Sequence, residues 1–142
     1  MTRSSDTQES PVVLVVGPDE SDRNLYGAWL EDAGMTPINC PGPGIPGFSC
    51  LGTCGRPCPL VEVADLAVLD TRHLPGLSKR GLPAWRLLRY YLGRGKPVVV
   101  IADQYRKDRT FRPEQVRVLT PNPGPESLLL SVKSMLKEAR MW

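Results

Sequence analysis

The chain has 142 residues, of which 41% are hydrophobic and 23% are charged. This length fits one domain with a conventional apolar core, and the sequence contains no apolar run of about 18 residues that could cross a membrane. The first ten residues, MTRSSDTQES, are polar and lack the apolar stretch of a secretory signal. We therefore expect a cytoplasmic protein with a disordered tail over residues 1–10 and one domain over residues 11–142.

Charge is unevenly distributed along the chain, although the net charge is only +3. Residues 1–66 carry nine acidic and three basic side chains, whereas residues 67–142 carry six acidic and fifteen basic ones. Such asymmetry is typical of a solvated surface, and it also suits a docking surface for an acidic partner. We do not expect nucleic-acid binding, because the basic half contains no helix-turn-helix or zinc-finger pattern.

The first predicted elements are a strand, a helix and a second strand. Residues 11–16 (PVVLVV) are too few for a typical helix and indicate a strand buried on both faces. Residues 21–33 predict a helix, with acidic residues at its start and Gly34 at its end. Its apolar stripe is formed by Leu25, Trp29, Leu30 and Ala33. Residues 35–40 (MTPINC) predict a short second strand.

The segment from Cys40 to Pro59 (CPGPGIPGFSCLGTCGRPCP) is dense in proline and glycine. These residues exclude a long helix or a central strand. We expect a loop here, and long ordered loops in small domains tend to be functional.

Regular patterns return in the second half of the chain. Residues 64–70 (ADLAVLD), 97–102 (PVVVIA) and 115–120 (QVRVLT) predict three more strands. Two further helices are expected over residues 82–93 and 126–141. The inner face of the last helix is expected to consist of Leu128, Leu129, Val132, Leu136 and Ala139.

Alternation of apolar strands with helices predicts a parallel sheet that is covered on both faces. With right-handed crossovers, the order of elements gives an α/β fold of the flavodoxin-like, doubly wound type with five strands. In this fold the Pro/Gly/Cys-rich loop replaces much of the second helix.

Three stretches of the chain resemble the receiver domains of bacterial response regulators, the CheY-like family. VLVVGPDESDRNLYGAWLEDAGM is similar to the start of such domains, and DLAVLDTRHLPG is similar to the segment around their phosphoaccepting aspartate. VRVLTPNPGPESLLLSVKSML is similar to their last strand and helix. The resemblance is absent over the cysteine-rich loop and most of the fourth helix.

The resemblance assigns Asp70 to the position of the aspartate that accepts a phosphoryl group. Gly17 and Pro18 occupy the positions of the acidic pair that holds Mg²⁺ in receiver domains, and neither side chain can ligate a cation. Asp19 is acidic but stands one position later, at the entry to the predicted helix, where we expect it to act as an N-cap.

Two other groups of the receiver site are also replaced. Ala102 occupies the position of the switch serine or threonine, and Thr120 or Pro121 occupies the position of the lysine after the last strand. A carboxylate without metal, lysine or hydroxyl lacks the charge neutralisation that phosphoryl transfer requires. We therefore interpret the chain as a degenerate receiver, or pseudo-receiver: not an enzyme, not expected to use Mg²⁺, and acting by binding a protein partner.

Several features of this interpretation stay open. A response regulator that accepts a phosphoryl group on Asp70 is the first alternative. The expected partner surface consists of the loops 40–60 and 103–113, and the resemblance also implies a homodimer. His73, the only histidine, follows Asp70 closely, and we interpret it as a surface residue rather than a catalytic one.

All four cysteines, Cys40, Cys50, Cys54 and Cys58, lie in the loop with the spacing C-x9-C-x3-C-x3-C. Four thiolates can hold zinc tetrahedrally or bind an iron–sulfur cluster, and clustered cysteines in a cytosolic chain favour metal or redox roles. Disulfide pairs and inert buried thiols are the alternatives. The loop therefore suggests a second function, that of a metal- or redox-responsive sensor.

Overall fold

A computed structural model describes residues 10–41, 57–71, 83–102 and 112–140, with the backbone alone described for residues 83–85 and 140. Its sheet has five parallel strands in the order β2-β1-β3-β4-β5. The strands are β1 (Val12–Val16), β2 (Thr36–Cys40), β3 (Leu66–Asp70), β4 (Val98–Ile101) and β5 (Val116–Leu119). The helices are α2 (Glu20–Asp32), α3 (Pro59–Val63), α4 (Pro83–Gly93) and α5 (Pro125–Arg140). Among the described residues, no helix is long and apolar enough to cross a membrane.

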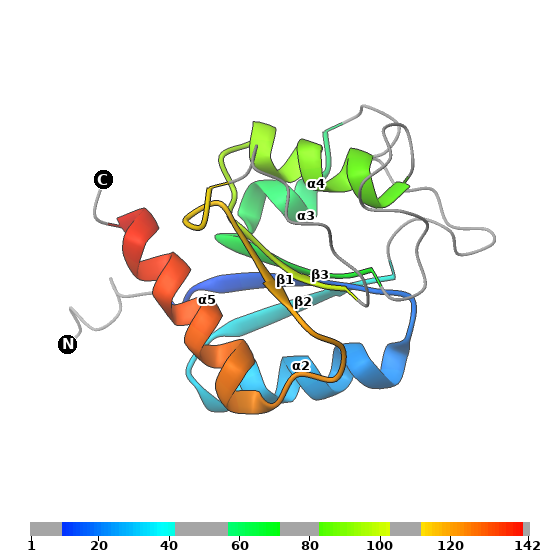
Figure 1. Ribbon diagram of the computed structural model, residues 1–142, viewed down its shortest axis with the longest axis vertical. Helices are drawn as coiled ribbons and strands as arrows, with labels where there is room; N and C mark the ends of the chain where they lie inside the picture. The colour runs from blue at the N-terminus through cyan, green and yellow to red at the C-terminus, as the bar shows by residue number, and fades with distance from the viewer. Residues whose placement is uncertain (1–9, 42–56, 72–82, 103–111, 141–142) are drawn as a thin grey trace.

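Helices cover both faces of the sheet. Figure 1 shows α3 and α4 on one face and α2 and α5 on the other. Because side chains alternate along a strand, each face has its own core cluster. The cluster beneath α3 and α4 includes Leu14, Val16, Leu69, Leu88 and Tyr91. The cluster beneath α2 and α5 includes Val13, Val15, Val68, Leu30 and Val132. Burial on both faces explains why the central strands are continuously apolar.

The strand register brings the carboxyl ends of the strands to one edge. Val16 at the end of β1 is paired with Cys40 of β2 and with Leu69 of β3, and Asp70 is paired with Ile101 of β4. The predicted flavodoxin-like, five-stranded fold is confirmed. From β1 the chain first crosses to β2 on one side and then returns to β3 on the other side. Folds of this type bind ligands at the carboxyl ends of the strands, at the point where the strand order reverses.

The ends of α2 form as the sequence indicates. The Oδ1 atom of Asp19 accepts a hydrogen bond from the backbone N–H of Asp22 at 3.1 Å, so Asp19 is the N-cap. Gly34 follows the helix with a φ of 87°, a conformation that favours glycine.

The predicted apolar face of α2 is wrong by one residue. Leu25 is 47% exposed, whereas Tyr26 and Leu30 are buried. Residues four apart share a helix face, so the helix directs Tyr26 and Leu30 toward the sheet and leaves Leu25 outside. A similar correction applies to α5, in which Ala139 is exposed.

A short helix, α3, occupies Pro59–Val63, where the sequence predicted the end of a loop. Pro59 suits the first helical position because its φ is already fixed near the helical value. Val61, in the middle of the helix, has a buried side chain. Tertiary packing of that side chain stabilises a helix too short to be apparent from periodicity. Four predictions fall outside the described residues: residues 1–9 of the tail expected over 1–10, the cysteines Cys50 and Cys54, His73, and the charged segment 103–111.

Candidate functional site

The candidate site lies at the carboxyl edge of the sheet, where Gly17, Asp70, Ala102 and Thr120 are at or just beyond strand ends. Asp70 is the last residue of β3 and is only 4% exposed. Buried carboxyl groups occur in proteins only where partners or function retain them. The structure therefore brings the predicted aspartate to the edge at which doubly wound folds bind ligands.

Gly17 lies against the side chain of Asp70. A Cβ atom added to Gly17 would be 3.1 Å from Cβ and 3.8 Å from Cγ of Asp70. The backbone N–H of Gly17 also donates to the carbonyl of Cys40 at 3.1 Å, which holds this residue beside β2. A carboxylate side chain at position 17 would therefore require β1, or the side chain of Asp70, to move.

Pro18 and Asp19 follow Gly17 at the entry to α2. Pro18 is half-buried and has no ionisable group. Asp19 uses its carboxylate to cap α2 by accepting from the N–H of Asp22. The expectation that Asp19 is a capping residue is confirmed.

Arg23 is a residue of this edge that the sequence analysis missed. Its Nη1 donates a hydrogen bond to the backbone carbonyl of Gly17, and its Nε is buried without a hydrogen-bond partner within the described part of the chain. The guanidinium therefore places a permanent positive charge beside the end of β1. The only feature of the sequence that could have indicated a role for Arg23 is its position in the first turn of α2, next to the acidic residues Glu20 and Asp22.

Thr71 was also missed, although it follows Asp70 directly. Its hydroxyl donates to the carbonyl of Ile101 at 2.9 Å, and its backbone N–H donates to the same oxygen at 2.8 Å. Thr71 is 8% exposed. These two bonds fasten the end of β3 to the end of β4.

Ala102 and Thr120 directly follow the ends of β4 and β5. Ala102 is buried, and its backbone N–H donates to the carbonyl of Leu119 at 3.1 Å. Thr120 is exposed. Asn122 follows with a φ of 55°, so the turn after β5 includes a left-handed residue, a conformation that asparagine tolerates better than most residues.

Two of the four cysteines lie in the described residues, and both are in the thiol form. Cys40, at the end of β2, belongs to the core cluster beneath α3 and α4, and Cys58 packs against that cluster. The backbone N–H of Cys58 donates to the hydroxyl of Tyr90 at 2.8 Å. Over the ranges that the structure describes, no three Cys, His, Asp or Glu side chains form a group that could hold a metal ion.

An ion pair joins the two helices on this face. Arg94 Nη2 lies 2.6 Å from Glu62 Oε1, and both side chains are substantially exposed. The hydrogen bond from Arg94 lowers the pKa of Glu62, with a further contribution from the nearby charge of Lys96. The same pair raises the pKa of Arg94. This contact links α3 to the end of α4 rather than forming part of the carboxyl edge.

No protein-family model and no curated protein matches the sequence. Solved structures do match the fold. A response regulator receiver protein from Sinorhizobium medicae is 14% identical and superposes with a TM-score of 0.65, with 93% of this chain and 98% of that chain covered. A CheY-like receiver domain from Methanospirillum hungatei is 16% identical with a TM-score of 0.66, covering 94% and 98%. The chemotaxis protein CheY4 from Vibrio cholerae is 15% identical with a TM-score of 0.60, covering 89% and 98%. The chain therefore has the fold of response regulator receiver domains.

Proposed function

We propose that this protein is a receiver-like signalling module that binds a protein partner without undergoing Mg²⁺-dependent phosphorylation of Asp70. The close packing of Gly17 on Asp70 carries the proposal. Magnesium requires several oxygen ligands in near-octahedral geometry. The side chain of Gly17 supplies none, and a Cβ added there would be 3.1 Å from the Cβ of Asp70, so that Asp70 or the end of β1 would have to shift.

The other residues of the carboxyl edge support the same function. Ala102 offers no hydroxyl and Thr120 no cation, so two groups that would bind a phosphoryl oxygen in a receiver domain are replaced. Arg23 supplies a positive charge at this edge. Its Nη1 is already used, because it donates a hydrogen bond to the backbone carbonyl of Gly17. The edge is suited to recognition by another protein rather than to group transfer.

Acetyl phosphate and Mg²⁺ test the proposal directly. We expect the intact mass of the protein to stay unchanged, while an ordinary receiver domain treated in parallel gains one phosphoryl group. A phosphoryl adduct on the wild-type protein that is absent from Asp70→Asn would show instead that Asp70 accepts phosphate, which is the rival function.

The cysteine loop supports a second candidate, a metal- or redox-responsive sensor. Cys40 and Cys58 pack in or against one core cluster, so the two ends of the loop lie on the same face of the sheet. Elemental analysis of freshly purified protein tests this candidate. Stoichiometric zinc or iron that is lost in Cys50→Ser and Cys54→Ser would support the sensor, whereas a metal-free protein with four titratable thiols would exclude a resident metal.

A further inference from the structure

A cavity of about 400 Å³ lies at the opposite edge of the sheet, beside the amino ends of β1 and β2. Small-molecule sites commonly have volumes in this range. The cavity lies between the end of α2 and the second half of α5. Its lining consists of Pro11, Ala33, Gly34, Met35, Lys133, Leu136 and Lys137.

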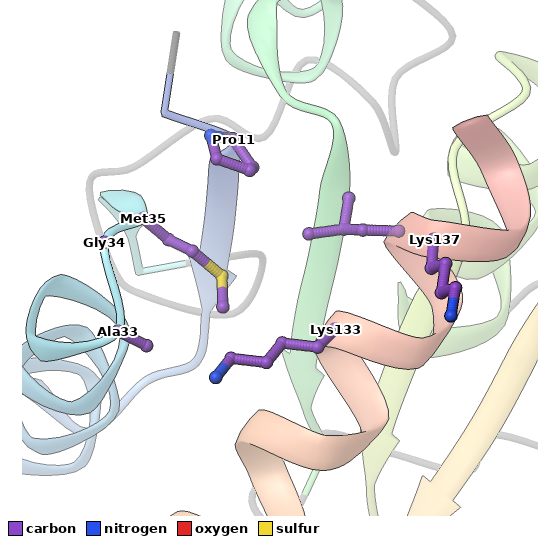
Figure 2. Close-up of a pocket in the computed structure, with 7 residues that line it drawn as sticks. Pro11, Ala33, Gly34, Met35, Lys133 and Lys137 are labelled. Atoms are coloured by element: carbon purple, nitrogen blue, oxygen red, sulfur yellow. The ribbon is translucent and has the colours of Figure 1, made fainter. Parts of the chain in front are cut away.

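The floor of this cavity is apolar. Met35 and Leu136 are each 6% exposed, and Figure 2 shows the thioether of Met35 between Pro11 and Lys133. Pro11 and Ala33 extend the apolar surface at one side. An apolar chain in this cavity would therefore remove hydrocarbon surface from water without losing a hydrogen bond.

Two lysines of α5 also line the cavity. Lys133 and Lys137 are one turn apart on α5 and exposed, and Lys133 extends toward Ala33 at the end of α2 (Figure 2). Neither lysine has an ion-pair partner among the described residues. The acidic residues of the last turn of α2, Glu31 and Asp32, do not line the cavity.

The charge of the cavity lining comes from two side chains. Lys133 and Lys137 are the charged residues among those that line it. The end of α2 at Ala33 contributes only a partial negative charge, so the lining attracts an anionic group, and a single carboxylate can pair with either lysine.

We propose that this cavity binds a small monocarboxylate with an unbranched apolar chain. The chain lies on Met35 and Leu136, and the carboxylate pairs with Lys133 or Lys137. The site is remote from Asp70 and independent of the function proposed for the carboxyl edge, so either proposal can fail without the other.

Sodium octanoate is the probe for the test. The methyl resonance of Met35, assigned with Met35→Leu, is expected to shift saturably at millimolar octanoate in the full chain. The double variant Lys133→Gln/Lys137→Gln is expected to weaken binding by up to about fivefold, because an exposed ion pair contributes at most about that factor. The variant Arg86→Gln/Arg89→Gln removes two exposed charges from α4 and is expected to bind octanoate as the wild type does.

Three results would overturn the proposal. The first is the absence of a saturable shift in a folded wild-type protein. The second is equal binding of octanoate and 1-octanol, together with no loss of affinity in the lysine variant. The third is a dimer that dissociates in the lysine variant, which would assign the cavity to a second copy of the chain. Thermal unfolding of each variant confirms that it is folded, and Ala33→Phe, which fills the cavity, is expected to abolish the shift.

Discussion

The Cα of Gly17 approaches Asp70 so closely that a Cβ on residue 17 would be 3.1 Å from the Cβ of Asp70. Parallel pairing of β1 with β3 fixes this approach, because Val16 and Leu69 are register partners immediately before the two residues. A Cβ on residue 17 would therefore make a tight contact, and Asp70 or the end of β1 would have to shift by a few tenths of an ångström to accommodate it.

The first prediction concerns this contact. Gly17→Ala is expected to lower the free energy of unfolding by about 1–3 kcal/mol, because overpacking a well-packed site forces its neighbours to shift. Urea unfolding measures the change. Gly124→Ala is the matched control, since a Cβ at position 124 meets nothing within 4 Å, and this variant is expected to unfold as the wild type does or slightly later. Equal stability of the two variants would contradict the steric account.

The second prediction concerns the hydroxyl of Thr71. Thr71→Val keeps the shape of the side chain but removes the hydrogen bond from the hydroxyl to the Ile101 carbonyl. The backbone N–H of residue 71 still donates to that carbonyl. Because the carbonyl oxygen of Ile101 keeps one hydrogen bond, we expect the free energy of unfolding to fall by only about 1 kcal/mol. Thr71→Ser retains the donor, so it should recover the hydrogen-bond contribution, measured by denaturant unfolding of all three proteins. A larger loss in Thr71→Ser than in Thr71→Val would show that the methyl group, not the hydroxyl, is what matters.

The third prediction separates a capping aspartate from a metal ligand. Asp19→Ala is expected to cost about 1 kcal/mol of stability, whereas Asp19→Asn should cost little, since asparagine caps helices about as well. Thermal unfolding with and without Mg²⁺ tests the assignment, and we expect the cation to leave all three melting temperatures unchanged. Stabilisation by Mg²⁺ that disappears in Asp19→Ala would instead identify a ligand.

The fourth prediction concerns pH and the pair formed by Glu62 and Arg94. The pKa of Glu62 lies below its ordinary value of 4.5, chiefly because Arg94 donates a hydrogen bond to its carboxylate. A lowered pKa in the folded state means that the stabilising effect of the pair is complete above the unfolded pKa and is lost as pH falls through the folded one. The carboxyl ¹³C shift of Glu62 should therefore titrate below pH 4.5, and Arg94→Gln should raise its midpoint. Because both groups are exposed, the effect should also weaken as salt is added.

Most of the fold could be predicted because its main signals are local. The strands β1, β3 and β4 are short apolar runs, and the carboxyl-edge position of Asp70 follows from the end of one such run. The inner face of α2 could not be assigned in the same way, because Leu25 and Tyr26 are adjacent large side chains and either one continues a helical stripe. Packing against Leu30 and the sheet decides in favour of Tyr26.

The candidate site was harder to predict than the fold because its properties depend on distances between strands. The sequence shows that the side chains of Gly17 and Pro18 cannot ligate a cation, but it does not show that Gly17 lies against the side chain of Asp70. The hydrogen bonds of Arg23 and Thr71 likewise join residues to carbonyls on another segment, and no periodicity reports such contacts. Short helices such as α3 are missed for a related reason, since their stability comes from tertiary packing.

The packing of residue 17 also ties two properties of this edge together. Any side chain at position 17, an acidic one included, would bring a Cβ to 3.1 Å from the Cβ of Asp70. A substitution there therefore changes the fit between the ends of β1 and β3 as well as the charge of the edge, so its effect on stability and its effect on binding arrive together.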